Sequence, residues 1–100
     1  MDQSSPLTGQ VALITGASRG IGLAIARRLG SMGARLGLCS RDARRLDEVA
    51  RQLSAAGVQV VAASCDVARG EDVNRWVAQM HEQLGDADIL VNNAGIGMFG

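Results

Sequence analysis

Apolar and amphipathic segments alternate along the chain, and this alternation predicts its secondary structure. Four short runs, at about 11–15, 36–39, 58–63 and 88–91, are apolar enough for buried strands. Three segments between them repeat apolar residues every three or four positions, as one face of a helix does. The expected order is therefore strand, helix, strand, helix, strand, helix, strand.

Each predicted helix begins and ends at recognisable residues. The first starts near Arg19–Gly20 and stops at Gly33. The second is capped by Asp42 and stops at Gly57, and the third spans about 70–84. The expected buried stripes are Ile21, Ala24, Ile25, Arg28, Leu29 and Met32; Leu46, Val49, Ala50 and Leu53; and Val73, Trp76, Val77, Met80 and Leu84. The arginine in the first stripe fits only if its charged head group turns outward to water.

Apolar strands separated by helices are typical of an α/β fold, a parallel sheet with helices on both faces. Because strand–helix–strand crossovers are right-handed, we expect a doubly wound sheet in the order 3-2-1-4. That order is the N-terminal half of a six-stranded, Rossmann-type dinucleotide-binding fold. Residues 1–8 are largely polar and contain the one proline, so we expect a flexible leader there and one domain over 9–100.

A glycine-rich turn joins the first strand to the first helix. Gly16, Gly20 and Gly22 follow the apolar run with the spacing G-x-x-x-G-x-G, and an amphipathic helix begins there. Glycine permits a tight turn and the close approach of a ligand, and the positive end of the helix dipole faces the same spot. This context favours a nucleotide-phosphate site over an ordinary strand-to-helix connection.

Ligands of such sheets bind at the carboxyl ends of the strands, where this chain carries small or polar residues. An acidic residue at the end of the second strand holds the ribose hydroxyls of NAD. Ser40 occupies this position and Arg41 follows it, while Arg19 lies in the glycine turn. Because arginine binds a 2′-phosphate that a carboxylate repels, NADP(H) is the preferred cofactor and NAD(H) the other option. Two alternatives stay open: Arg41 is a solvated residue before a helix, or Asp42 binds the ribose.

The composition excludes several other classes of protein. The net charge is zero, so we expect no nucleic acid and no membrane as partner, and we expect a cytoplasmic protein. Cys39 and Cys65 lack a metal-ligand spacing and are interpreted as buried reduced thiols, and His81 as a surface histidine. All ten cationic residues are arginine, so the lysine of a P-loop nucleotide hydrolase is missing.

Three motifs in register resemble the short-chain dehydrogenase/reductase family. They are Thr15–Gly22 (TGASRGIG), Asp66-Val67 and Asn92–Gly95 (NNAG), and the resemblance extends over residues 8–100. Segments 39–42 and 95–100 are most similar to the 3-oxoacyl-acyl-carrier-protein reductase-like members of the family. The resemblance implies an oxidoreductase that forms homo-oligomers and transfers a hydride between NADPH and a ketone, 3-oxoacyl or secondary alcohol substrate.

The resemblance also implies roles for individual residues. The glycine turn surrounds the pyrophosphate and the adenosine ribose, Asp66 and Val67 bind the adenine, and the NNAG motif lines the ribose next to the nicotinamide. Asp66 is alternatively a helix cap after the third strand, and Asn92 is expected to brace the central strands. The full set of expected cofactor-binding residues is Gly16, Ser18, Arg19, Gly20, Ile21, Gly22, Arg41, Asp66, Val67, Asn93, Ala94 and Gly95.

The catalytic residues of that family have no counterpart in this chain. Its hydride chemistry needs a tyrosine acid, a lysine that lowers the tyrosine pKa and a serine that holds the carbonyl oxygen, all from beyond the NNAG motif. The chain contains no tyrosine and no lysine. We therefore expect a fragment that is truncated after the fourth strand and inactive alone, with that strand as an exposed edge. The competing hypothesis is a stand-alone, non-catalytic nucleotide-binding module.

Overall fold

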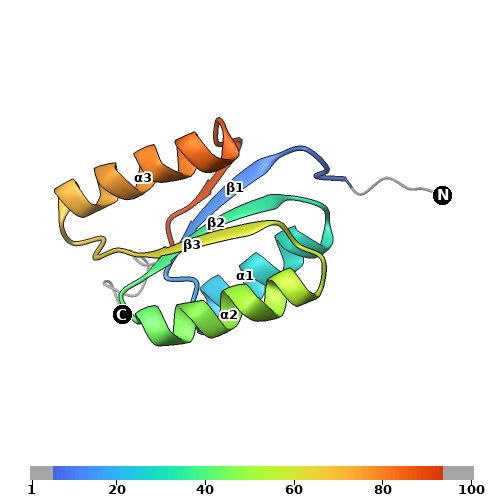
Figure 1. Cartoon of the computed structure of the whole chain (residues 1–100), viewed down its shortest axis with the longest axis horizontal. Coiled ribbons are helices and arrows are strands. Elements are labelled where there is room, and N and C mark those ends of the chain that lie inside the picture. The colour runs from blue at the N-terminus through green and yellow to red at the C-terminus, as the bar shows by residue number, and fades with distance from the viewer. Residues whose placement is uncertain (1–5, 94–100) are drawn as a thin grey trace.

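The computed structural model of the chain describes residues 6–93. Its elements are β1 (Val11–Thr15), α1 (Gly20–Ser31), β2 (Arg35–Ser40), α2 (Ala43–Ala55), β3 (Val60–Ser64), α3 (Gly70–Leu84) and β4 (Ile89–Val91). The four strands form a parallel sheet in the order β3-β2-β1-β4 (Figure 1). The predicted alternation, strand order and Rossmann-type fold are therefore confirmed.

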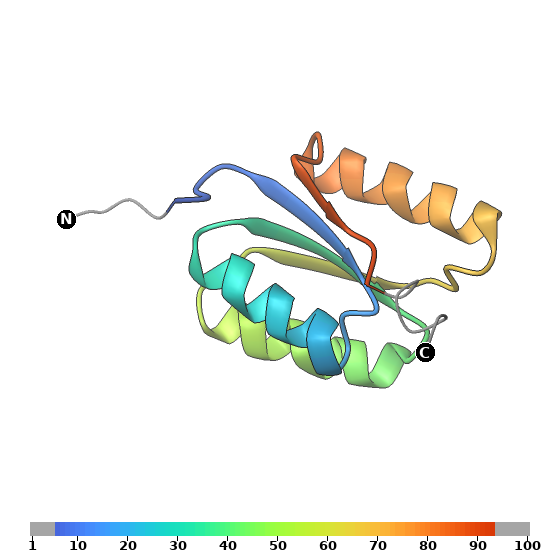
Figure 2. The same ribbon diagram turned by 180° about the vertical axis from the view of Figure 1, so that it is seen from behind.

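Helices cover both faces of the sheet. Figure 1 and Figure 2 show α1 and α2 on one face and α3 on the other. Alternate residues of a strand point to opposite faces. Ala12 and Ile14 of β1 accordingly belong to the core beneath α1 and α2. Val11 and Leu13 belong to the second core, beneath α3. Burial on both faces explains why β1 and β2 are apolar almost throughout.

The buried face of α1 differs from the predicted one. Its buried residues are Gly22, Ala26 and Gly30, which recur every four positions, whereas Ile21 is 65% exposed. The helix lies so close to its neighbours that a Cβ atom on Gly30 would be 3.0 Å from a methyl group of Val58. Small residues therefore form the contact, and larger apolar side chains flank it. The stripe through Ile21, Ala24, Ile25, Arg28, Leu29 and Met32 is wrong as a buried face, although Ile25 and Leu29 pack partly against the core.

The second helix agrees with its prediction. The side chain of Asp42 accepts a hydrogen bond from the Arg45 N–H and so caps α2, as expected. Its buried residues are Leu46, Val49 and Leu53, all of them in the predicted stripe. The backbone turns at Gly57, which has a φ of 92°, a conformation that favours glycine.

The third helix has the predicted bounds at both ends, and its buried residues are Trp76, Met80 and Leu84. Trp76 Nε1 donates a hydrogen bond to the Leu38 carbonyl at 3.2 Å, which ties α3 to β2. The expectation that Val77 is also buried is wrong. It is 41% exposed because, together with Leu90, it lines an open cavity between α3 and β4.

Several smaller features complete the described part of the chain. The Leu7 N–H donates to the Met32 carbonyl at 2.8 Å, so the segment before β1 contacts the end of α1. Cys39 and Cys65 are buried free thiols, as predicted. His81 is exposed and lies 3.1 Å from a carboxylate oxygen of Asp86, which agrees with a surface histidine. No helix within residues 6–93 has both the length and the apolar character that a membrane crossing requires.

Candidate functional site

The glycine turn closes tightly between β1 and α1. Gly16 and Gly20 have φ values of 63° and 59°, a region of backbone space that other residues rarely adopt. Gly22 packs directly against the turn, because a Cβ atom there would overlap the Gly16 carbonyl. The three glycines therefore have separate reasons to be there: two for backbone conformation and one for close packing.

The N-terminus of α1 presents unpaired donors. Its N-cap residue, Arg19, makes no side-chain cap, and the first turn contains no acidic residue. Within residues 6–93, the amides of Gly20, Ile21 and Gly22 have no hydrogen-bond acceptor, whereas the Leu23 N–H bonds to the Arg19 carbonyl at 3.3 Å. Free amides at the positive end of a helix dipole bind anions, and phosphate above all.

Two asparagines connect the end of β4 to this turn. Asn93 Nδ2 donates to the Gly16 carbonyl at 3.2 Å, so its side chain holds the glycine turn. Thr15 Oγ1 donates to Asn92 Oδ1 at 3.2 Å, which links the ends of β1 and β4 as the bracing role of Asn92 requires. Ala94 and Gly95, expected beside the nicotinamide ribose, lie outside the described residues.

A buried pair of hydroxyls joins the turn to the end of β2. Ser18 Oγ and Ser40 Oγ are 2.8 Å apart, and the two residues are only 4% and 8% exposed. Arg45 Nε donates to the Ser18 carbonyl at 3.0 Å, a contact that sequence reasoning missed. The Ala17 N–H donates to the Cys39 carbonyl at 3.1 Å. These contacts fix the turn against β2 and α2.

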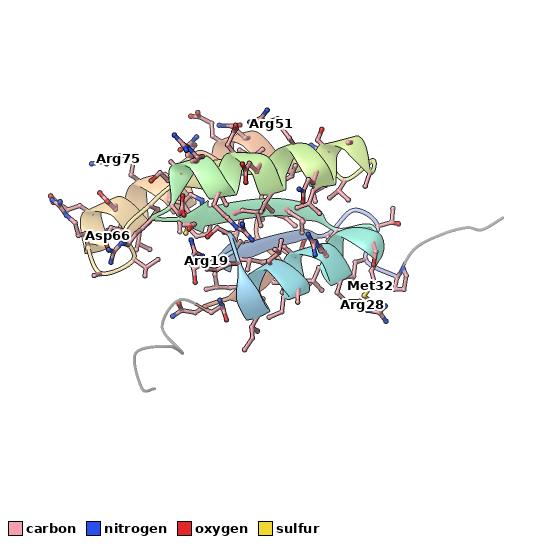
Figure 3. The ribbon with its side chains drawn as sticks, turned by 90° about the horizontal axis from the view of Figure 1, so that it is seen from below. Arg19, Arg28, Met32, Arg51, Asp66 and Arg75 are labelled. Atoms are coloured by element: carbon pink, nitrogen blue, oxygen red, sulfur yellow. The ribbon has the colours of Figure 1, made fainter. Side chains whose placement is uncertain are left out.

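Two arginines and an aspartate lie close to the glycine turn and the end of β2, and within residues 6–93 only one of the arginines is paired. Arg19 Nη2 forms an ion pair with Asp42 Oδ2 at 2.8 Å. Arg41 is exposed and makes no hydrogen bond or ion pair with any residue from 6 to 93. The Arg45 N–H, together with the charge of Arg19, lowers the pKa of Asp42, so this carboxylate is charged at neutral pH. Figure 3 labels Arg19 at the start of α1, at the opposite end of that helix from Arg28 and Met32.

Asp66 and Val67 follow β3 at the same edge of the sheet. Asp66 Oδ1 accepts the Ala68 N–H at 3.0 Å. The alternative prediction, that Asp66 caps α3, is wrong because the N-cap residue of that helix is Arg69. The Asp66 side chain instead stabilises the turn that precedes the helix. The Val67 side chain is half-buried and packs against the core beneath α3.

The two buried cysteines, Cys39 and Cys65, have raised pKa values. Burial, and then the neighbouring Cys65, raise the pKa of Cys39 to about 12, and burial raises the pKa of Cys65 as well. Neither thiol is therefore a nucleophile at neutral pH. Among the residues that the structure describes, no group of three or more His, Cys, Asp or Glu side chains could hold a metal ion.

Comparison with known proteins identifies the chain's relatives. The family model for short chain dehydrogenases matches residues 10–100. A protein of Streptomyces violaceoruber, named as a ketoacyl reductase of the granaticin polyketide synthase, is 51% identical over 85 residues, or 85% of this chain and 31% of the relative. The chain spans about a third of the length of the curated relatives it matches.

Solved structures agree with this relationship. A metagenomic short-chain oxidoreductase in complex with NADP is 46% identical with a TM-score of 0.82, over 87% of this chain and 39% of that one. A short-chain dehydrogenase/reductase from Burkholderia phymatum in complex with NAD is 34% identical with a TM-score of 0.82, over 84% and 30% of the two chains. The chain belongs to the short-chain dehydrogenase/reductase family.

Proposed function

We propose that this chain is the NADP(H)-binding part of an oxidoreductase that transfers a hydride between NADPH and a ketone, a 3-oxoacyl group or the corresponding secondary alcohol. The observation that carries the proposal is the set of open amides of Gly20, Ile21 and Gly22 at the start of α1. They lie at and beside Gly20, where an added Cβ atom would have no neighbour within 4 Å. An anionic pyrophosphate fits this site, because it accepts hydrogen bonds from amides that have no acceptor among residues 6–93.

The remaining residues of the edge would hold the other parts of the dinucleotide. Ser18 and Arg19 would lie against the pyrophosphate and the adenosine ribose, and Asp66 and Val67 against the adenine. Asn93, with Ala94 and Gly95, would line the ribose next to the nicotinamide. The bound cofactor would supply the hydride, and these residues would orient it.

The proposed preference for NADP(H) rests on the positive charge of Arg41 and on the neutral, hydrogen-bonded hydroxyl of Ser40. Arg41 is exposed and unpaired within residues 6–93, so its guanidinium can bind a 2′-phosphate bidentately. Ser40 is neutral and its hydroxyl is already bonded to Ser18 and to the Asp42 N–H. No carboxylate thus stands at the position that holds the ribose hydroxyls of NAD. Asp42 already accepts hydrogen bonds from Arg19 and from the Arg45 N–H, so a ribose bound to it would share the carboxylate with Arg19.

The proton-transfer residues would come from outside this chain. It contains no tyrosine and no lysine and spans about a third of its curated relatives, so catalysis is proposed for the complete protein only. The division into a leader over 1–8 and a domain over 9–100, a cytoplasmic location and homo-oligomeric assembly are further proposals.

The test measures binding and turnover separately on the complete protein. NADPH binding is followed by calorimetry, and NADPH oxidation by absorbance with ketone and 3-oxoacyl substrates. The proposal expects both. Binding without turnover on any carbonyl substrate would favour the second candidate, a non-catalytic nucleotide-binding module, which the missing tyrosine and lysine support. Absence of binding would contradict both candidates.

A further inference from the structure

Asp42 joins three parts of the site through separate atoms. Oδ1 accepts the Arg45 N–H at 3.1 Å and caps α2, while Oδ2 accepts Arg19 Nη2 at 2.8 Å. Its own N–H donates to Ser40 Oγ at 3.1 Å. The residue therefore holds a helix start, a strand end and an arginine of the glycine turn in one arrangement.

Of the two arginines at this edge, Arg19 is in an ion pair and Arg41 has no partner within residues 6–93. The Arg19 side chain is 67% exposed, yet its guanidinium is engaged by Asp42. The Arg41 guanidinium has no partner within the described range. A 2′-phosphate placed at the end of β2 would consequently meet one available arginine and one that is already neutralised.

Resting on the proposed function, we infer that Asp42 competes with the 2′-phosphate for Arg19 and so limits the preference for NADP(H) over NAD(H). An exposed ion pair is weak, whereas a guanidinium binds phosphate bidentately, so the phosphate displaces the carboxylate. The Arg45 N–H keeps Asp42 in place after the exchange. NADPH therefore binds at the cost of the Arg19–Asp42 ion pair, which the free protein keeps. NAD(H) has no 2′-phosphate and leaves the Arg19–Asp42 pair intact.

One substitution separates the two roles of Asp42, as the cap of α2 and as a competitor for Arg19. Asparagine caps helices as well as aspartate does, so Asp42→Asn keeps the bond to the Arg45 N–H and removes the charge from Arg19. Asp47→Asn is the matched control, because it removes the same charge from the same helix. Asp47 forms an exposed 2.8 Å ion pair with Arg51, away from the glycine turn.

The experiment measures the dissociation constants of NADPH and NADH with the complete protein by titration of nicotinamide fluorescence. In Asp42→Asn the ratio Kd(NADH)/Kd(NADPH) should rise roughly three- to tenfold, through tighter binding of NADPH. In Asp47→Asn it should change by less than about twofold. In an Arg19→Gln background, Asp42→Asn should also change the ratio by less than about twofold, because the guanidinium for which Asp42 and the 2′-phosphate compete has been removed.

The outcomes distinguish this inference from the proposed function. An unchanged or lower ratio in Asp42→Asn, while NADPH still binds, overturns the competition alone. An equal rise in Asp47→Asn, or a full rise without Arg19, also overturns it, since the effect would then be one of general charge. Failure of the unaltered protein to bind either dinucleotide overturns the proposed function, and with it the basis of this inference.

Discussion

Replacement of Gly22 by alanine tests how tightly α1 packs against the glycine turn. Gly22 lies in the first turn of α1 and has no positive φ, so helix propensity alone predicts that alanine stabilises the fold by about 1 kcal/mol. The packing predicts the opposite. The new Cβ atom would overlap the Gly16 carbonyl and lie 2.7 Å from Asn93 Nδ2.

The expected loss follows from these contacts. The overlapped atom belongs to the backbone and cannot rotate away, so α1 or the turn has to shift, which costs about 1–3 kcal/mol. The shift also strains the 3.2 Å bond from Asn93 Nδ2 to the Gly16 carbonyl, worth about 1 kcal/mol. Set against the gain in propensity, the free energy of unfolding should fall by about 1–3 kcal/mol.

Two other helical glycines provide matched controls. Gly70 begins α3, and a Cβ atom added to it would have no neighbour within 4 Å, so Gly70→Ala should be neutral or slightly stabilising. Gly30→Ala should fall between the two, because its neighbours are the methyl groups of Val58 at 3.0 and 3.1 Å, which can move. Urea denaturation followed by circular dichroism gives all three values. A Gly22→Ala protein at least as stable as Gly70→Ala would refute the described packing.

Three further predictions concern the cofactor preference and the two cores. Arg41→Asp should shift the preference of the complete protein toward NADH in paired binding titrations, and an unchanged NADPH preference would contradict the role of Arg41. Cys39 and Cys65 should resist iodoacetamide in the native protein at pH 8 and react after unfolding in urea, because burial raises both pKa values; fast native labelling in mass spectrometry would count against this. Trp76→Phe should lower the free energy of unfolding by about 1–3 kcal/mol in urea titrations, because the Leu38 carbonyl loses the indole N–H; an equally stable variant would show that this bond is unimportant.

The order of elements could be predicted because β1 and β2 are buried on both faces and α2 and α3 are strongly amphipathic. The ends of α3 coincide with the predicted 70–84. Hydrophobic periodicity failed for α1, because glycine and alanine carry little hydrophobic signal although they allow the closest helix contact. Arg28 within the predicted stripe, and the regular spacing of Gly22, Ala26 and Gly30, were the available signals of the true buried face.

The pairing of polar side chains could not be predicted from position in the sequence. The pattern predicted that Arg19 lies in the turn and that Asp42 caps α2, but not that the two residues bind each other. The same holds for the Ser18–Ser40 hydroxyl pair. Such contacts depend on the distance between the turn and the end of β2, which follows from how the strands and helices pack.

An amide NMR titration with NADPH tests whether the start of α1 binds the phosphates of a nicotinamide dinucleotide. The backbone amides of Gly20, Ile21 and Gly22 should show the largest shifts, because they are the donors that lack an acceptor within residues 6–93. Amides in the middle of α3, on the other face of the sheet, should hardly change. Saturable binding that leaves the three amides at the start of α1 unshifted would show that the phosphates bind elsewhere.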